Sequence, residues 1–247
     1  MHGNYNRIRR IDNLIIKTFE SQERFDSEIK YNGVFKNLGF RVPEIISSNT
    51  KELEVVTKFI CGASKTTLSS KDIDRCLKEL AKIYTIWSSR IEGNEIKKKY
   101  LSSLKQNISL YADSKGLVVN QIVLDDEIDR VSDYFRPSLF KDAKPANWIF
   151  NKDGVWMIDF DYVRPSYYLA DVMQLLNYQN LNLHSEYIYV KRFHELIKLS
   201  PPKVSVAALV GVNSKIMSMR YNKNLNTSYR DSFDVSIKNT LEEMGIV

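Results

Sequence analysis

Three polar side chains near the middle of the chain, Asp142, Asn147 and Asp159, are of the types that hold metal ions and orient reacting hydroxyl groups. They border two short apolar runs, residues 147–150 and 155–158, and the Asn/Asp/Gly-containing segment between these runs predicts a β-hairpin. Since a hairpin brings the outer ends of its strands together, the three side chains could meet there. Two oxygen ligands for a divalent cation, beside a third carboxylate, would suit phosphoryl transfer.

A second pair of charged residues lies closer to the N-terminus. Residues 5–11 and 13–19 predict another hairpin, and Lys17 lies on its second strand. The next segment, residues 21–38, has the apolar spacing of a helix, and Glu28 borders its apolar stripe. An unpaired buried carboxylate is costly, so we expect Lys17 to pair with Glu28. Glu23, nearer the start of this helix, is a weaker alternative partner, and a lysine that simply faces solvent is another alternative.

The predicted secondary structure changes along the chain. Residues 40–46 and 53–60 predict two more strands, whereas residues 68–139 have mostly helical spacing, and Gly62 breaks the pattern between them. We therefore predict an α+β fold with a hinge at residues 58–62. The predicted domains are an N-terminal lobe of residues 1–61 and a C-terminal helical lobe of residues 62–247.

The C-terminal part predicts a series of helices that carry no recognisable binding motif. They are expected at residues 69–87, 95–112, 125–135, in the second half of 162–178, and over 186–247 with a break at 200–203.

Composition excludes several classes of protein. The 247 residues are 43% hydrophobic and 27% charged, as in ordinary folded domains. A net charge of +6 suits an anionic ligand, and no concentrated basic run favours nucleic acid. No apolar run reaches the roughly 20 residues of a membrane helix, and the start has no signal-peptide core, so we expect a cytoplasmic protein. Cys61 and Cys76 lack the spacing of a zinc site, and we expect both to be small buried hydrophobes.

The order of these features resembles the protein-kinase-like superfamily, and within it the aminoglycoside phosphotransferase and choline kinase type. The resemblance spans about residues 3–178. It implies a two-lobed fold, in which a small antiparallel sheet lobe with one helix precedes a larger helical lobe with the catalytic hairpin. The segments that carry it are LIIK (14–17), RFDSEI (24–29), GFRVPEI (39–45), TKFICG (57–62), KDAKPANWIF (141–150), WMIDFD (156–161) and LADVMQLL (169–176).

The resemblance implies ATP and Mg²⁺ as cofactors. Lys17 would contact the α- and β-phosphates of ATP while Glu28 holds it in place. The backbone groups of Lys58, Phe59 and Ile60 would hold the adenine.

It also implies roles for the residues around the predicted hairpin. Asp142 would accept or orient the proton of the attacking hydroxyl, and Lys144 would steady the transferred phosphate. Asn147 and Asp159 would bind Mg²⁺.

Three positions depart from the usual protein-kinase pattern. Phe140 occupies the place of a histidine two residues before the catalytic aspartate, and Asp161 replaces a glycine, although small-molecule kinases often have an acidic residue there. The N-terminal segment 3–6 contains only one glycine where a phosphate-covering loop is expected.

The leading hypothesis is an ATP-dependent kinase that transfers the γ-phosphoryl group to a hydroxyl of a small molecule, such as a sugar, an amino alcohol or an aminoglycoside-like compound. On the same fold, the alternatives are a lipopolysaccharide-core sugar kinase, a spore-coat kinase-like protein or an atypical protein kinase. A non-catalytic pseudokinase that acts as a binding module is another alternative. A purely structural protein would require the Lys17–Glu28 pair to lie apart from the hairpin residues. The acceptor and the oligomeric state stay open.

Overall fold

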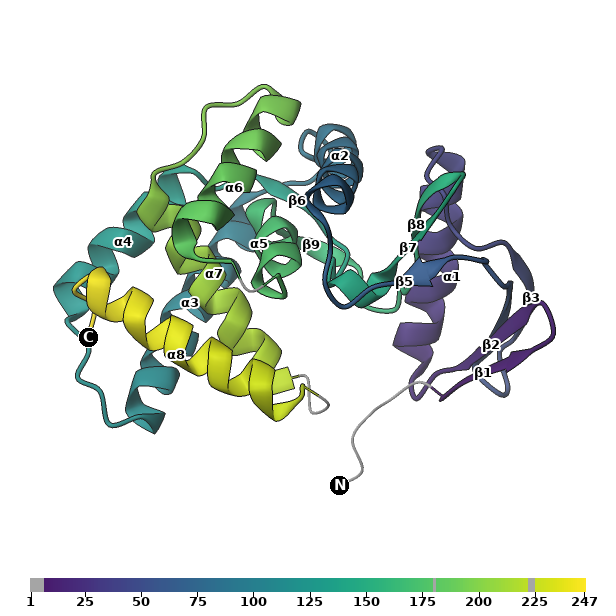
Figure 1. The fold of residues 1–247 in the computed structure, drawn as a ribbon, viewed down its shortest axis with the longest axis horizontal. Coiled ribbons are helices and arrows are strands. Elements are labelled where there is room, and N and C mark those ends of the chain that lie inside the picture. Colours follow the sequence, from purple (N-terminus) through teal and green to yellow (C-terminus); the bar gives the residue numbers. More distant parts are fainter. Residues whose placement is uncertain (1–6, 180, 222–224) are drawn as a thin grey trace. The chain divides into compact units, whose positions relative to one another are not determined.

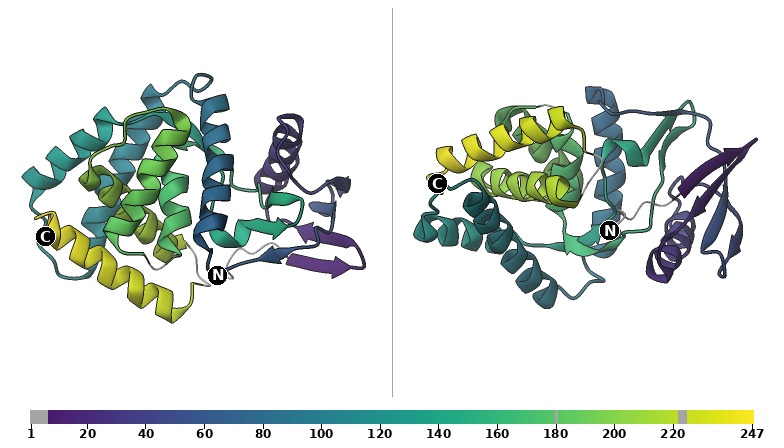
Figure 2. Two further views of the ribbon diagram at one scale, coloured as in Figure 1. Left: turned by 45° about the horizontal axis from the view of Figure 1, so that its top comes forward. Right: turned by 90° about the horizontal axis from the view of Figure 1, so that it is seen from below.

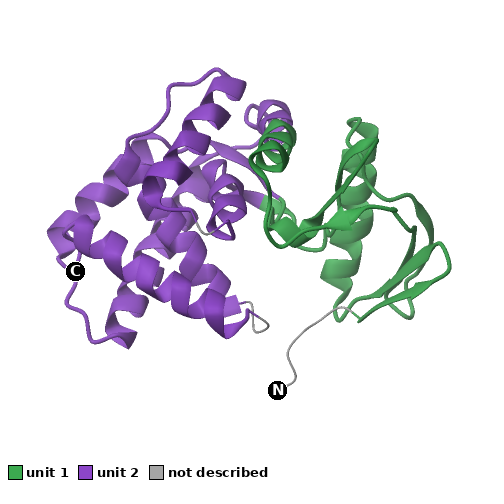
Figure 3. Ribbon diagram, in the orientation of Figure 1, with its two compact units in different colours: residues 1–79, 141–164 green, residues 80–140, 165–247 purple. Residues whose placement is uncertain are grey.

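The chain forms two compact units in a computed structural model that describes residues 7–179, 181–221 and 225–247. Unit 1 contains residues 1–79 and 141–164, and unit 2 contains residues 80–140 and 165–247 (Figure 3). This grouping differs from the predicted lobes of residues 1–61 and 62–247, because the hairpin segment groups with the N-terminal part. It does not test the boundary between the lobes, which stays a prediction.

Unit 1 is built on a four-stranded antiparallel sheet. Its strand order is β1-β2-β4-β3. Strands β1 and β2 form the hairpin predicted for residues 5–19 (Figure 1). The register places Ile8 opposite Lys17 and Arg10 opposite Ile15. The strands are β1 (Arg7–Ile11), β2 (Leu14–Thr18), β3 (Ile45–Asn49) and β4 (Glu54–Lys58).

The third strand lies further along the chain than predicted. It was expected at residues 40–46, but β3 begins at Ile45. Pro43 has no amide hydrogen to give to a ladder. Its carbonyl accepts from Nδ2 of Asn32 (3.0 Å), and the carbonyl of Arg41 accepts from the amide of Met157 (2.9 Å). The backbone of residues 41–43 therefore bonds to other parts of unit 1, and the sheet is reached only at Glu44, whose carbonyl accepts from the amide of Lys58 at 2.8 Å.

The single helix of this sheet region is α1 (Gln22–Asn37), close to the predicted residues 21–38. The Ser21 side chain caps it by accepting from the amide of Arg24 at 3.4 Å. After the helix, Gly39 has a φ of +80°, which glycine adopts without strain. The buried side of α1 packs on the sheet, where Phe25 joins Phe19 and Val55 in one hydrophobic cluster.

The predicted catalytic hairpin is present, and a third short strand extends it. The sheet order is β5-β7-β8, and Asn151 pairs with Gly154, so only Lys152 and Asp153 form the turn. Oδ1 of Asn151 accepts from the amides of Asp153 (2.9 Å) and Gly154 (3.1 Å), which fixes the turn locally. The elements are β5 (Ala63–Ser64), the 3₁₀ turn η1 (Pro145–Asn147), β7 (Trp148–Asn151) and β8 (Gly154–Met157).

The remaining elements are mostly helical, and α7 contacts most of the other helices of unit 2 (Figures 1 and 2). Residues 206–213 of this helix are all buried. Along the described ranges of the chain, no helix is both long enough and apolar enough to cross a membrane. The helices are α2 (Ser70–Trp87), α3 (Asn94–Ser114), α4 (Gln121–Asp133), α5 (Leu169–Asn177), α6 (Leu183–Ile197), α7 (Val204–Tyr221) and α8 (Thr227–Glu243).

Three further details of the sequence prediction were wrong. Helix α4 begins at Gln121 and not at residue 125, because the Asn120 side chain caps it by accepting from the amide of Val123. A two-stranded sheet of β6 (Pro137–Phe140) and β9 (Arg164–Tyr167) was not predicted. Cys76 is buried as expected, but Cys61 is exposed. The predicted α+β class with a small antiparallel sheet is confirmed.

Candidate active site

The ammonium group of Lys17 is the centre of a charged cluster in unit 1. Its Nζ donates to Oε2 of Glu28 (3.1 Å) and to Oδ1 of Asp159, and Oδ2 of Asp161 lies 3.9 Å away. Only 12% of the Lys17 side chain is exposed. Lys17 therefore pairs with Glu28 as expected, and residues far apart in the sequence meet around it.

Helix α1 holds the segment that follows β8. Oε2 of Glu28 accepts from the amide of Phe160 at 2.8 Å, and the hydroxyl of Ser27 donates to the Phe160 carbonyl at 2.8 Å. The ring of Phe160 is fully buried and stacks on Phe35, with ring centroids 5.2 Å apart. Glu28 thus has two partners, the Lys17 ammonium and the backbone between Asp159 and Asp161.

Burial and charge oppose each other in this cluster. Burial acts to lower the pKa of Lys17, but the carboxylates of Glu28, Asp159 and Asp161 outweigh it and raise that pKa. Burial raises the pKa of Glu28, against the effect of the Lys17 ammonium. For Asp159, burial acts upward, but the charges of Lys17 and Lys144 lower the pKa to about 2. Asp159 is therefore a carboxylate over the whole physiological pH range.

A second cluster forms where the chain enters the hairpin. Nδ2 of Asn147 donates to the carbonyl of Asp142 (2.7 Å) and to its Oδ2 (3.1 Å). Nζ of Lys144 lies 2.7 Å from the same Oδ2. The Asp142 carboxylate is thus held by the side-chain amide of Asn147 and the ammonium of Lys144.

The two clusters lie at the same end of the hairpin, within unit 1. The amide of Ile158, which precedes Asp159, donates to the carbonyl of Asn147 at 3.1 Å. Lys144 pairs with Asp142 and also acts electrostatically on Asp159. The convergence expected for Asp142, Asn147 and Asp159 is therefore present.

Both aspartates have an unusual backbone conformation. Asp142 has a φ of 64° and Asp159 a φ of 68°, in the left-handed region that few residues other than glycine occupy. Such conformations cost free energy and are concentrated at functional sites, where the surroundings hold them. Here the bonds of Asn147 and the contact with Lys17 supply that restraint.

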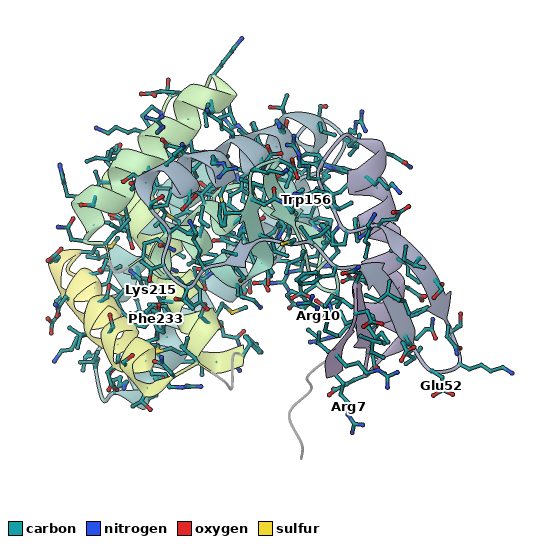
Figure 4. All side chains as sticks on the ribbon, turned by 45° about the vertical axis from the view of Figure 1, so that its right-hand side comes forward. Arg7, Arg10, Glu52, Trp156, Lys215 and Phe233 are labelled. Atoms are coloured by element: carbon teal, nitrogen blue, oxygen red, sulfur yellow. The ribbon has the colours of Figure 1, made fainter. Side chains whose placement is uncertain are left out.

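The predicted adenine-binding residues line a cavity of about 790 Å³. Lys58, Phe59 and Ile60 form part of its wall, together with Phe150 and Trp156 from the hairpin. Figure 4 labels Trp156. Neither Lys17 nor Asp159 lines this cavity. Lys58, Phe59 and Ile60 therefore line a cavity that the charged cluster around Lys17 does not reach.

The donor atoms near the hairpin suit a hard cation. Within residues 7–179, 181–221 and 225–247, no group of three or more His, Cys, Asp or Glu side chains gathers as metal ligands. The predicted pair consists of one amide oxygen, from Asn147, and one carboxylate, from Asp159. Mg²⁺ is usually bound by one or two protein carboxylates and completes its shell with water and substrate phosphates, so the pair fits this ion.

Two further residues of the site were not predicted from the sequence. Nη1 of Arg24 lies 3.5 Å from Oδ2 of Asp161, and its position four residues before Glu28 could have indicated that it shares a helix face with it. Lys141 is fully buried, with Nζ 4.6 Å from the ring centroid of Trp148 and 3.4 Å from the Ile158 carbonyl. Its burial depends on tertiary packing, which the sequence pattern does not show.

The glycine-poor segment 3–6, where a phosphate-covering loop was expected, lies outside the described residues.

No protein-family model matches the sequence, and no curated protein matches it. Solved structures do match over nearly the whole chain. The GDP complex of aminoglycoside 2′-phosphotransferase-IIIa is 12% identical, with a TM-score of 0.65 over 99% of this chain and 91% of that chain. The choline kinase LicA from Streptococcus pneumoniae is 15% identical, with a TM-score of 0.61 over 97% and 89%. The streptomycin–ATP–APH(2″)-IIa complex is 16% identical, with a TM-score of 0.52 over 99% and 94%.

These matches agree with the motifs that predicted the superfamily. At 12–16% identity they show a shared fold, and that fold covers the segments that carry the charged clusters. The chain has the protein-kinase-like fold of the choline kinases and aminoglycoside phosphotransferases.

Proposed function

We propose that this protein is a phosphotransferase that moves the γ-phosphoryl group of ATP to a hydroxyl of a small molecule. The observation that carries the proposal is the meeting of Lys17, Glu28 and Asp159 with Asp142 and Asn147 at one end of the hairpin. Phosphoryl transfer needs little covalent chemistry from the protein. It needs positive charge on the phosphates, a held metal ion and an oriented hydroxyl, and this arrangement has side chains suited to each of the three tasks.

Each polar group has a role that follows from its contacts. Lys17, buried and held by Glu28, would donate to the nucleotide phosphates. Asp142 would accept a hydrogen bond from the acceptor hydroxyl and take its proton, because its carboxylate is oriented by Asn147 and Lys144. Lys144 would place its positive charge near the transferred group.

Asn147 and Asp159 would hold Mg²⁺ through Oδ1 and the carboxylate, respectively. When bound, the ion would supply positive charge that offsets the negative charge developing in the transition state. The lowered pKa of Asp159 supports this role, since a metal ligand has to be ionised.

The structural neighbours support a nucleotide donor and a small-molecule acceptor. Two of them were determined with GDP or with ATP and streptomycin, and a third is a choline kinase. A purine nucleoside triphosphate is therefore the donor to test first, with ATP ahead of GTP. Amino alcohols and aminoglycosides are the acceptors to test first.

The proposal is tested by measuring ADP or GDP formation in the presence of Mg²⁺ with a panel of choline, ethanolamine, simple sugars and aminoglycosides. We expect one acceptor class to stimulate turnover, and Asp142→Asn to lower kcat by about 10²–10⁴-fold. Asp153→Asn, in the exposed turn of the same hairpin, is the matched control and should keep wild-type turnover. Turnover that survives Asp142→Asn would contradict the proposed role. Nucleotide binding without any turnover would indicate a non-catalytic binding protein instead.

A further inference from the structure

The strand β1 presents two different sets of side chains on its two faces. Because side chains alternate along a strand, Ile8 and Arg10 share the face of Ile15 and Lys17, their partners on β2. Arg9 points to the opposite face, where its Nη2 lies 2.9 Å from Oε2 of Glu54. Of these two neighbouring arginines, only Arg10 is on the Lys17 face.

Arg10 is held at the hinge end of that face. Its guanidinium carbon lies 3.7 Å from the ring centroid of Phe59, and its Nε donates to the carbonyl of Asp12 at 2.9 Å. The amide of Phe59 in turn donates to the carbonyl of Asn13 at 2.8 Å, which fixes the hinge to the β1–β2 turn. Figure 4 marks Arg10 near this end of the strand and Arg7 near the other. The guanidinium is thus oriented before any ligand binds.

The surface around Arg10 is accessible in the described part of unit 1. Helix α1 covers the sheet on the β4 side, where Phe25 packs on Val55. On the β1 side, Arg10 is exposed, Ile15 is half-buried, and Ile8 is 66% exposed. An apolar strip that ends in a stacked guanidinium is a surface on which a flat aromatic ring could lie.

We propose that Arg10 is a nucleotide-binding residue whose guanidinium stacks on the purine base of the donor. This inference rests on the proposed function. If Lys17 holds the phosphates, the nucleotide extends along the same sheet face toward the hinge, and the base arrives at Arg10. A guanidinium is planar and weakly hydrated, so it stacks on aromatic rings on either side of its plane. The guanidinium lies over the Phe59 ring and Arg10 is exposed, so we expect the base to stack on it from the solvent side.

The position of Arg10 favours the base over the phosphates as its ligand. Arg10 lies opposite Ile15, two residues along β2 from Lys17, and its Nε is occupied by the carbonyl of Asp12. The contact with Phe59 restricts the side chain further and lowers the ordering cost of stacking. Arg10 would therefore bind the nucleoside part of the donor, with no direct role in phosphate transfer.

The experiment compares the affinities of wild-type protein, Arg10→Ala, Arg10→Lys and Arg9→Ala for MgATP, adenosine and inorganic tripolyphosphate. Arg10→Ala should weaken MgATP and adenosine by about tenfold each and leave tripolyphosphate unchanged. Arg10→Lys should restore little, because lysine keeps the charge but loses the planar group. Arg9→Ala should bind all three ligands like the wild type.

Three results would overturn the inference. Unchanged MgATP and adenosine affinities in Arg10→Ala would show that Arg10 does not contact the base. A loss confined to MgATP and tripolyphosphate, restored by Arg10→Lys, would show that Arg10 holds phosphates instead. Wild-type protein that binds no MgATP would remove the proposed function and this inference together, whereas the first two results would leave the proposed function standing.

Discussion

At the scale of single residues, the nearly buried side chain of Lys17 is surrounded by negative charge. Its ammonium is nearly buried, and it lies against the carboxylates of Glu28, Asp159 and Asp161. Removal of a buried partner leaves uncompensated charge, which costs more free energy than the pair contributed. Lys17 therefore serves the stability of unit 1 as well as the proposed chemistry.

Lys17→Met is expected to lower the free energy of unfolding by on the order of 3 kcal/mol, because Glu28 and Asp159 then lose the ammonium to which both are bonded. Adding Glu28→Gln should recover part of that loss, because it removes one of the buried negative charges. The measurement is a double-mutant cycle from urea unfolding. Lys152→Met, in the exposed hairpin turn, is the control and should change little. Strictly additive effects of the two substitutions would contradict the coupling.

The sequence predicted the contact between Lys17 and Glu28 because it follows from one local argument. Glu28 borders the buried stripe of a helix, and a buried carboxylate needs a cation from a neighbouring element. Lys141 could not be found in this way. Lys141 lies between Phe140 and Asp142, and nothing in this local sequence predicts that it is buried. Its burial becomes clear only from the structure, in which its ammonium lies over the ring of Trp148.

At the scale of elements, the hairpin and α1 position the site. The hairpin was predictable because its turn chemistry is local, with Asn151 closing the turn through its own side chain. The predicted position of β3 was wrong because the backbone of residues 41–43 bonds to Asn32 and Met157. These partners lie elsewhere in the sequence, so the local spacing of apolar residues does not reveal them. Strands β6 and β9 were missed because each is short and contains a proline.

The hairpin also packs closely on Gly62, the last residue of the predicted hinge. A Cβ on Gly62 would lie 2.6 Å from Cγ2 of Ile149 and 2.8 Å from the Phe150 carbonyl. Gly62→Ala should therefore lower the free energy of unfolding by about 1–3 kcal/mol, since the backbone has to shift. In Gly33→Ala, the matched control within α1, the new Cβ meets nothing within 4 Å. Thermal unfolding should show this control to be more stable than wild type by about 0.5–1 kcal/mol. Equal effects of both substitutions would contradict the close approach at Gly62.

At the scale of the whole molecule, unit 2 contains a buried histidine whose protonation would oppose folding. His194 is fully buried, with Nδ1 2.7 Å from the Val190 carbonyl and Nε2 2.6 Å from the Tyr168 hydroxyl. A carbonyl only accepts, so Nδ1 carries the hydrogen and Nε2 accepts from Tyr168 in the neutral ring. Burial lowers the pKa of His194 from its ordinary value of 6.5.

The lowered pKa fixes the direction of a pH effect. Below about pH 6.5, His194 is protonated in the unfolded chain but stays neutral in the folded chain until the pH reaches its lowered pKa. The free energy of unfolding therefore falls as the pH falls below about 6.5. The loss due to this residue is at most about 1.4 kcal/mol per pH unit. His194→Gln should be less stable than wild type at pH 8, and the difference should shrink toward pH 5. A constant difference across that range, measured by denaturant unfolding, would contradict a neutral buried His194.

The solved structures share the fold of this chain over 97–99% of its length, although only 12–16% of the residues are identical. The apolar spacing and the few charged positions were enough to predict an α+β protein-kinase-like fold. The acceptor was not predictable, because the helical segments that would recognise it have apolar spacing typical of any core. Residues such as Arg10 become informative only when the strand register assigns them to a face.

The central claim is that Lys17, Asn147 and Asp159 hold one magnesium nucleotide, and calorimetric titration of ATP with and without Mg²⁺ tests it most directly. In wild-type protein, we expect Mg²⁺ to strengthen ATP binding. In Asp159→Asn, which keeps the shape of the side chain but loses its charge, the strengthening by Mg²⁺ should disappear, and Lys17→Met should weaken binding under both conditions. ATP affinity that is independent of Mg²⁺ in wild-type protein, or unchanged in both variants, would contradict the account.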